Sequence, residues 1–187
     1  MKFKNIFLHF HMINKHRMLV FRFCVRAGIP FRGLVHDLSK YSPTEFIESV
    51  KYYNGKKSPI SYCKKDIGYS KAWLHHKGRN KHHHEYWYDY SAPMATPLMP
   101  YKYIVEMICD TLAAGMAYNG KNWTNQTQLD YYLEDRKKKK INPVLDKILL
   151  NVYEEVSVNG IKKTITKKNI KKIYDECVKD EVGNINE

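Results

Sequence analysis

The sequence has few cysteines and lacks a long apolar run. Its four cysteines are scattered and form no CxxC pair, which argues against a disulfide-stapled fold and against a zinc ribbon. The apolar stretch near the N-terminus is broken by histidine, asparagine, lysine and arginine, unlike a signal peptide. No other stretch approaches the roughly eighteen apolar residues of a membrane span. We therefore expect a soluble, cytoplasmic protein with reduced cysteines and no membrane partner.

Acidic residues are also scarce relative to basic ones. There are 32 lysines and arginines against 19 aspartates and glutamates, giving a formal net charge of +13. Such an excess favours anionic partners, such as nucleotides, nucleic acid or a membrane surface. Much of it lies in lysine clusters within residues 137–140 and 162–168, which fit a solvated surface equally well. The charge alone does not choose between these alternatives.

Strand patterns are nearly absent, and helical spacing dominates. Apolar residues recur at helical spacing over residues 5–27, before Gly28 and Pro30. Pro30 is expected to open a short helix, and the capping box beginning at Ser42 predicts another from Pro43 to Tyr53. Further helices are predicted over residues 70–76, from Pro100, and over 125–136, 143–156 and 166–178, whereas residues 54–70 and 77–99 are expected to be loops.

Residues 154–166 give the only hint of strand, and they fit a hairpin or a helix–loop–helix junction equally well. We find no internal repeat and no linker, and 187 residues suffice for one compact domain. We therefore expect an all-α fold in a single domain over residues 1–187. Its core would span about residues 5–120, and a helical extension would span about residues 121–187.

All nine histidines lie between residues 9 and 84. His36-Asp37 places an imidazole beside a carboxylate, a nitrogen and oxygen set suited to Zn, Mn, Fe, Co or Ni. A helix-end aspartate beside a partly buried histidine would give the same dipeptide. His9 and His16 are seven residues apart, about two helical turns, and so share one face of their helix.

Residues 75–87 hold five further histidines together with aromatic and basic residues. In a chain this basic, clustered imidazoles would repel one another when protonated, and a metal that keeps them neutral would explain why they lie together. A solvated loop would also tolerate them. Asp110 falls on the apolar face of the helix from Pro100. It needs a cation or strong donors there, because an unpaired buried charge is costly. A salt bridge to a lysine is the alternative.

The segment His36-Asp37-Leu38-Ser39-Lys40 resembles the HD superfamily of metal-dependent phosphohydrolases. In that superfamily a histidine, a His-Asp pair, further histidines and a late aspartate converge inside a helical bundle. The resemblance implies an HD-domain-like helical bundle that binds one or two divalent transition-metal ions. The ligands that it implies are His16, His36, Asp37, His75, His76, His83 and Asp110.

The same resemblance implies a phosphohydrolase or phosphodiesterase that acts on a nucleotide or another phosphate ester. The metal would lower the pKa of a bound water, which then attacks phosphorus. We expect Lys40 and Arg79 to neutralise phosphate oxygens, and Glu45 or Glu85 to relay a proton to the leaving group. The predicted substrate-binding residues are Lys40, Lys77, Asn80, His82 and Tyr86.

The motif order over about residues 9–118 resembles in particular the uncharacterised bacterial and phage family DUF5662. The residues that carry this likeness include Ala72-Trp73-Leu74-His75-His76, Asn80, His82-His83 and Tyr86-Trp87. His84 stands where an aromatic is expected, and the Gly-Tyr-Pro element of the cyclic-dinucleotide HD enzymes is missing. Two alternatives to hydrolysis stay open: an HD-type di-iron oxygenase, and a non-enzymatic protein in which a structural metal holds a nucleic-acid-binding scaffold.

Overall fold

The computed structural model describes residues 3–185. Within them the chain forms ten α-helices and four single-turn 3-10 helices, with no strand. The predicted all-α fold is therefore confirmed. No helix among the described residues combines the length and the apolar character needed to cross a membrane.

The first two helices pack closely against each other. Helix α1 spans Phe3–Arg26 and α2 spans Pro30–Val35, as the sequence predicts. Gly33 makes their close approach possible, because a Cβ at this position would lie 2.6 Å from the Cβ of Cys24. The 3-10 helix η1 (Leu38–Tyr41) follows α2, so the His-Asp pair occupies the turn between them.

Three short helices follow, and one of them corrects the sequence prediction. Helix α3 (Pro43–Tyr52) begins at the expected cap, where the Ser42 side chain accepts a hydrogen bond from the Glu45 backbone. Residues 54–70 were expected to be loop, but they contain α4 (Pro59–Ile67), which starts with proline in its first turn and ends at Gly68 with a φ of 83°. Helix α5 (Lys71–Arg79) is capped by Ser70 and extends the predicted helix by one turn.

The second half is built from longer helices. Helix α6 spans Tyr101–Asn119, α7 spans Thr127–Asp135 and α8 spans Pro143–Asn159. After α8, Gly160 has a φ of 76° and leads into α9 (Ile161–Thr164) and α10 (Lys167–Ile185). Residues 154–166 therefore form a helix–loop–helix junction. The 3-10 helices η2 (His84–Trp87), η3 (Gly120–Asn122) and η4 (Arg136–Lys138) lie in the connections.

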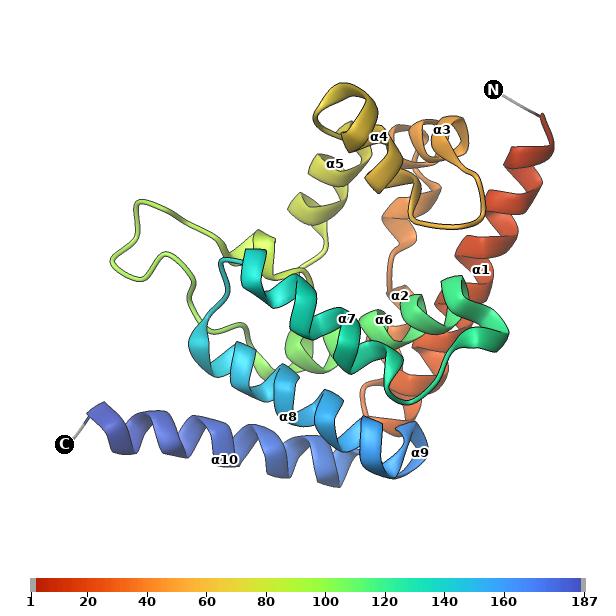
Figure 1. Cartoon of the computed structure of the whole chain (residues 1–187). Coiled ribbons are helices and arrows are strands. Elements are labelled where there is room, and N and C mark those ends of the chain that lie inside the picture. Colours follow the sequence, from red (N-terminus) through yellow and green to blue (C-terminus); the bar gives the residue numbers. More distant parts are fainter. Residues whose placement is uncertain (1–2, 186–187) are drawn as a thin grey trace.

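Figure 1 shows two groups of helices, with α1 running along both. Helices α6, α7, α8 and α10 form one group, whereas α3, α4 and α5 gather beside the other part of α1. The main apolar core draws its buried side chains from α1, α6, α7, α8 and α10, so the helices after residue 120 share it. Within the described part of the chain, α3, α4 and α5 supply no residue to that core cluster and pack mainly on one another.

Candidate metal centre

Seven of the chain's histidine and aspartate side chains converge between the two groups of helices. His16 comes from α1, the pair at 36 and 37 from the turn after α2, His76 from α5 and Asp110 from α6. The turn before η2 supplies the remaining two histidines. Six of the seven are at most 9% exposed: His16, His36, Asp37, His76, His82 and Asp110. His83 is half-buried beside them.

Arg17 holds the turn that carries His36 and Asp37. Its Nε donates to the His36 carbonyl oxygen at 2.9 Å, and its Nη2 donates to the Leu34 carbonyl oxygen at 2.8 Å. These bonds satisfy carbonyl groups that the end of α2 leaves without partners in the helix. Asp37 has a φ of 53° and is the only non-glycine residue with positive φ among residues 3–185. This left-handed conformation costs roughly 1 kcal/mol or more, so the surrounding contacts must hold it.

One oxygen of Asp37 belongs to a first group of possible ligands. The Nε2 of His36 lies 3.2 Å from Asp37 Oδ2 and 3.4 Å from Asp110 Oδ1. The Nε2 of His16 lies 3.0 Å from the same Asp110 oxygen. One ligand atom from each of these four residues lies within 4.8 Å of the other three. The group has two nitrogen and two oxygen donors.

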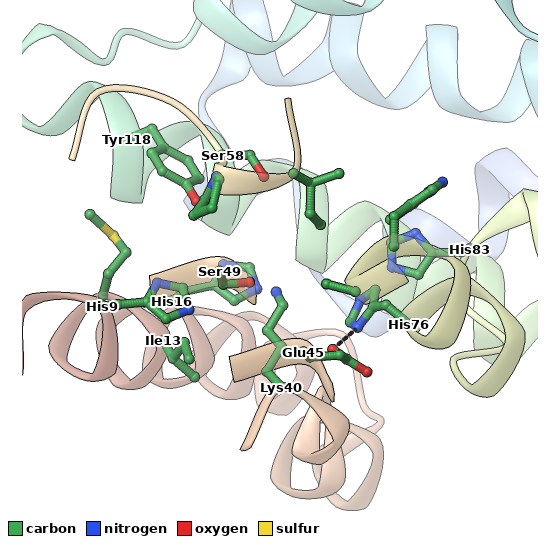
Figure 2. Close-up of a pocket in the computed structure, with 15 residues that line it drawn as sticks. His9, Ile13, His16, Lys40, Glu45, Ser49, Ser58, His76, His83 and Tyr118 are labelled. Atoms are coloured by element: carbon green, nitrogen blue, oxygen red, sulfur yellow. Dashed lines mark hydrogen bonds and ion pairs between the residues drawn. The ribbon is translucent and has the colours of Figure 1, made fainter. Parts of the chain in front are cut away.

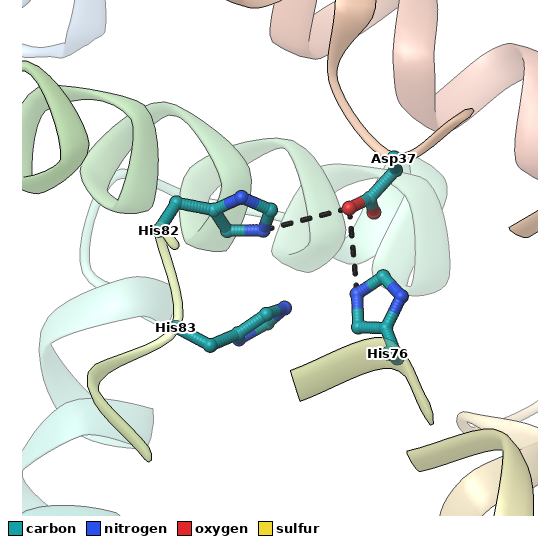
Figure 3. Close-up of side chains that lie close together, drawn as sticks. All are labelled: Asp37, His76, His82 and His83. Carbon is teal, nitrogen blue, oxygen red and sulfur yellow. Dashed lines mark ion pairs between the residues drawn. The ribbon is translucent and has the colours of Figure 1, made fainter. Parts of the chain in front are cut away.

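The other oxygen of Asp37 belongs to a second group (Figure 3). Asp37 Oδ1 lies 3.3 Å from His76 Nε2 and 3.5 Å from His82 Nε2, and the His83 ring lies beside both histidines. One ligand atom from each of these four residues again lies within 4.8 Å of the other three. Asp37 is therefore common to two adjacent groups, and each of its oxygens faces a different one.

Many of these buried atoms have no hydrogen-bond partner. Among the described residues, the unpaired atoms at the site are the Nε2 atoms of His16, His36 and His83, both ring nitrogens of His82 and both carboxylate oxygens of Asp37. Several lie 3.0–3.3 Å from a carboxylate oxygen or ring nitrogen of another ligand residue, and Asp37 Oδ2 also forms an ion pair with Lys40. Each buried polar atom without a partner costs roughly 1–3 kcal/mol. A cation coordinated by them would remove this cost, and the nitrogen and oxygen donors fit a divalent transition metal.

Two carboxylates behind the histidines fix how the rings point. Glu106 Oε1 accepts a hydrogen bond from His36 Nδ1 at 3.0 Å and lies 3.3 Å from His82 Nδ1. Glu45 Oε2 accepts from His76 Nδ1 at 2.7 Å. An ionised carboxylate only accepts, so the Nδ1 atoms of His36 and His76 carry protons and their Nε2 atoms face the ligand groups, where a metal would displace any proton on them.

Glu106 also forms an ion pair with Arg32. The Arg32 Nε and Nη2 atoms lie 2.7 and 2.6 Å from Glu106 Oε2. His36, His82 and Glu106 form a third cluster close enough for a metal. A metal bound there would have to use the Nδ1 atoms of both histidines instead of their Nε2 atoms. The Arg32 guanidinium also already neutralises the Glu106 carboxylate. We therefore interpret Glu106 as an orienting residue.

Charge at the site favours a cation. Burial alone would raise the pKa of Asp37, but the charges of His36 and Lys40 hold it well below its usual range. Burial opposes ionisation of Asp110 too, and its pKa is held low by His16 and His36. The pKa of Glu106 falls to about 2, because the nearby His36 and His82 outweigh the effect of burial. The carboxylates that face the centre are therefore ionised.

Comparison with protein-family models identifies the family of this chain. A model described as a family of unknown function (DUF5662) matches residues 5–155. The chain belongs to this family. The match includes every residue of the two ligand groups. Comparisons with curated proteins and with solved structures found no match, so the chemistry of this DUF5662 protein must be argued from its site.

Two predicted site residues lie apart from the ligand groups of the DUF5662 protein. His75 donates through Nδ1 to Glu45 Oε1 at 2.7 Å, and its Nε2 accepts from Arg79 Nε at 2.7 Å. Both nitrogens of His75 are thus engaged, and no group of possible ligands includes it. Arg79 is exposed and directs its Nε at His75. His82, expected to bind substrate, is instead in the second ligand group.

The remaining predicted residues occupy different places. Lys40 Nζ lies 2.5 Å from Asp37 Oδ2. Both Glu45 oxygens accept from histidines, which leaves Glu45 as an orienting group. Asn80 donates to the His76 carbonyl oxygen at the end of α5 and to Ser39 Oγ. Lys77 is half-buried and Tyr86 is exposed, and neither is among the residues that line the pocket beside the ligand groups.

That pocket opens beside the ligand groups and has a volume of about 170 Å³. Figure 2 shows the Lys40 side chain reaching into it between His16 and His76. His9, which shares a face of α1 with His16, lines the same pocket. The residues around it come from α1, η1, α3, α4, α5 and α6, so its walls join both groups of helices.

Glu106 was not among the site residues predicted from the sequence. It precedes Asp110 by four residues, which places both carboxylates on one face of α6. A second acidic residue on that apolar face was the available signal.

Proposed function

We propose that this DUF5662 protein is an HD-type metal-dependent phosphohydrolase that holds two divalent transition-metal ions. The observation that supports the proposal is the sharing of Asp37 between two groups of closely placed ligand atoms, several of which are buried and unpaired. Two-metal hydrolytic sites use ions about 3.5–4 Å apart, and a carboxylate with one oxygen in each group suits such a pair.

The two groups define which residues would hold each ion. The first ion would take His16, His36, Asp37 and Asp110, and the second would take Asp37, His76, His82 and His83. When bound, such ions lower the pKa of a coordinated water and polarise phosphoryl oxygens. Mixed imidazole and carboxylate donors suit Mn, Fe, Zn, Co or Ni.

The chain's own residues would bind and neutralise the substrate. Lys40 lines the pocket, and the charges of Asp37 and Asp110 outweigh the effect of burial and raise its pKa. Its ammonium group stays charged and would bind phosphate oxygens. Burial raises the pKa of Tyr118, so its hydroxyl keeps its proton and can donate a hydrogen bond to the substrate.

Elemental analysis of protein purified without chelators or a histidine tag tests the metal sites. We expect two ions per chain. His76→Ala should lose the second ion, whereas its neighbour His75→Ala should keep both, because the groups include only His76. A wild-type protein that retains no transition metal would exclude the proposal.

Hydrolysis of p-nitrophenyl phosphate with added Mn²⁺ tests the chemistry. His36→Ala should abolish hydrolysis while the circular dichroism spectrum stays helical. The exposed His11 provides the matched control, and His11→Ala should retain full activity. Equal activity in both variants would show that the hydrolysis comes from elsewhere.

An HD-type di-iron oxygenase is the second candidate. Five histidines in the two groups give a donor set that also accommodates iron. This function predicts bound iron and substrate-dependent uptake of oxygen, while the hydrolase predicts release of phosphate without oxygen.

A further inference from the structure

We propose that the site acts on phosphomonoesters of short alkyl alcohols and excludes nucleotides. This inference rests on the proposed hydrolase function, and it concerns the size and chemistry of the pocket beside the ligand groups (Figure 2).

The pocket is small. Its volume of about 170 Å³ compares with about 150 Å³ for a cavity that holds one benzene molecule. Pockets that enclose larger ligands measure roughly 300–1,000 Å³. A phosphate group and a chain of a few carbons would therefore fill the space, whereas the base and most of the sugar of a nucleotide would remain outside.

The pocket walls differ in chemistry. Lys40 lines the pocket together with the ligand residues His16 and His76, and it would bind the phosphate. Apolar side chains of α1 and α4 also line the pocket, namely Met12, Ile13, Pro59 and Ile60. Ile13 and Pro59 are buried, so part of the pocket wall is apolar and favours an alkyl group over a polyhydroxylated sugar.

Two aromatic rings near the site, those of Tyr86 and Trp73, already contact neighbouring side chains, while Tyr118 lines the pocket. Tyr86, which the sequence analysis expected to bind substrate, is 38% exposed and packs against Trp87 and Lys81. Trp73 does line the pocket. Its ring already contacts His83, at 5.0 Å between centroids, and lies 4.8 Å from the Lys64 Nζ.

The reaction is hydrolysis of the ester bond. Water adds to phosphorus and the bond from phosphorus to the alkyl oxygen breaks. The alkoxide takes a proton from the attacking water, so the products are inorganic phosphate and the short alcohol. No oxidant or second substrate is required.

The test compares n-propyl phosphate with adenosine monophosphate on the full chain loaded with Mn²⁺. We expect kcat/KM to be at least about tenfold higher for n-propyl phosphate, since most of the nucleotide gains no contact in the pocket. Calorimetric binding of n-propylphosphonate, which is not hydrolysed, provides a readout independent of turnover.

Ile60 and Ile67 offer a matched pair of variants on α4. Ile60 lines the pocket, while Ile67 is 48% exposed and does not. Because overfilling a packed site is strongly unfavourable, Ile60→Trp should weaken n-propylphosphonate binding by about tenfold or more. Ile67→Trp should change it by less than about twofold. If Ile60→Trp does not fold, Ile60→Ala should instead improve binding of n-hexylphosphonate relative to n-propylphosphonate.

The outcomes separate this inference from the proposed function. Hydrolysis of adenosine monophosphate as fast as of n-propyl phosphate, or no effect of either Ile60 variant, would overturn the size inference and leave the hydrolase standing. Binding of n-propylphosphonate that depends on Ile60, without hydrolysis of either ester, would support the ligand class and reject the hydrolase. Neither binding nor hydrolysis would reject both.

Discussion

Replacing Glu106 with glutamine should weaken metal binding at both ligand groups. Glu106 is fully buried, accepts from His36 Nδ1 and lies 3.3 Å from His82 Nδ1. His36 belongs to the first group and His82 to the second. Glutamine has nearly the same shape, but it has one acceptor oxygen and no charge, so it cannot serve both rings and Arg32 together.

The expected size of the effect follows from these contacts. Loss of one orienting partner of a metal-ligating histidine costs about 10–100-fold in metal affinity. Because Glu106 faces two such histidines, we expect a loss near 100-fold, or about 2.7 kcal/mol. The metal-free protein should also lose about 1–3 kcal/mol of stability, since the buried His36 and the half-buried Arg32 lose their best acceptor.

The measurement is Zn²⁺ affinity by competition with a chelator, with thermal unfolding in excess chelator as the check on folding. Glu155→Gln is the matched control, because its carboxylate is half-buried on α8 and accepts from Asn169 at 2.8 Å, outside both ligand groups. A folded Glu106→Gln protein whose Zn²⁺ affinity stays within about threefold of that control would refute the orienting role.

Three further predictions follow from single residues. Asp37→Ala should remove both ions, since one Asp37 oxygen faces each group; elemental analysis that finds one ion fully retained would contradict this sharing. Burial lowers the pKa of His9 from 6.5 to about 4. The unfolded chain therefore binds the proton first, and wild-type stability should fall relative to His9→Gln as the pH drops from 6.5 towards 4, by at most about 3 kcal/mol. Urea unfolding of both proteins at several pH values checks this, and a constant difference would count against it. Gly33→Ala should destabilise the protein by about 1–3 kcal/mol, because its Cβ would lie 2.6 Å from the Cys24 Cβ; an unchanged urea midpoint would show that α1 and α2 can move apart.

Local signals in the sequence predicted most helices. Ser42, Ser70 and Asn142 each cap a helix with a side-chain hydrogen bond, and such caps act over three or four residues. Helix α4 was missed because the turn residues near Asn54 and the polar composition outweighed the proline at its start. Its apolar residues do recur at helical spacing, so the sequence contained a helix signal that the turn residues outweighed.

The site was predictable in composition but not in detail. The order of histidines and aspartates indicated a converging set, yet adjacent residues on a helix point about 100° apart. His76 faces Asp37 while His75 turns to Glu45 and Arg79. This choice depends on how α5 packs against α3, which no local pattern specifies.

Asp37 joins ligands from two parts of the molecule that share few apolar contacts. His16 and Asp110 come from α1 and α6, which build the main core. His76 belongs to α5, which packs with α3 and outside that core cluster in the described residues. Bound ions would therefore act as a cross-link between the two parts. Chelation should raise the rates of amide hydrogen exchange and of proteolysis in residues 43–79 more than in α6. A low supply of metal in the cell would therefore expose this part of the chain to degradation.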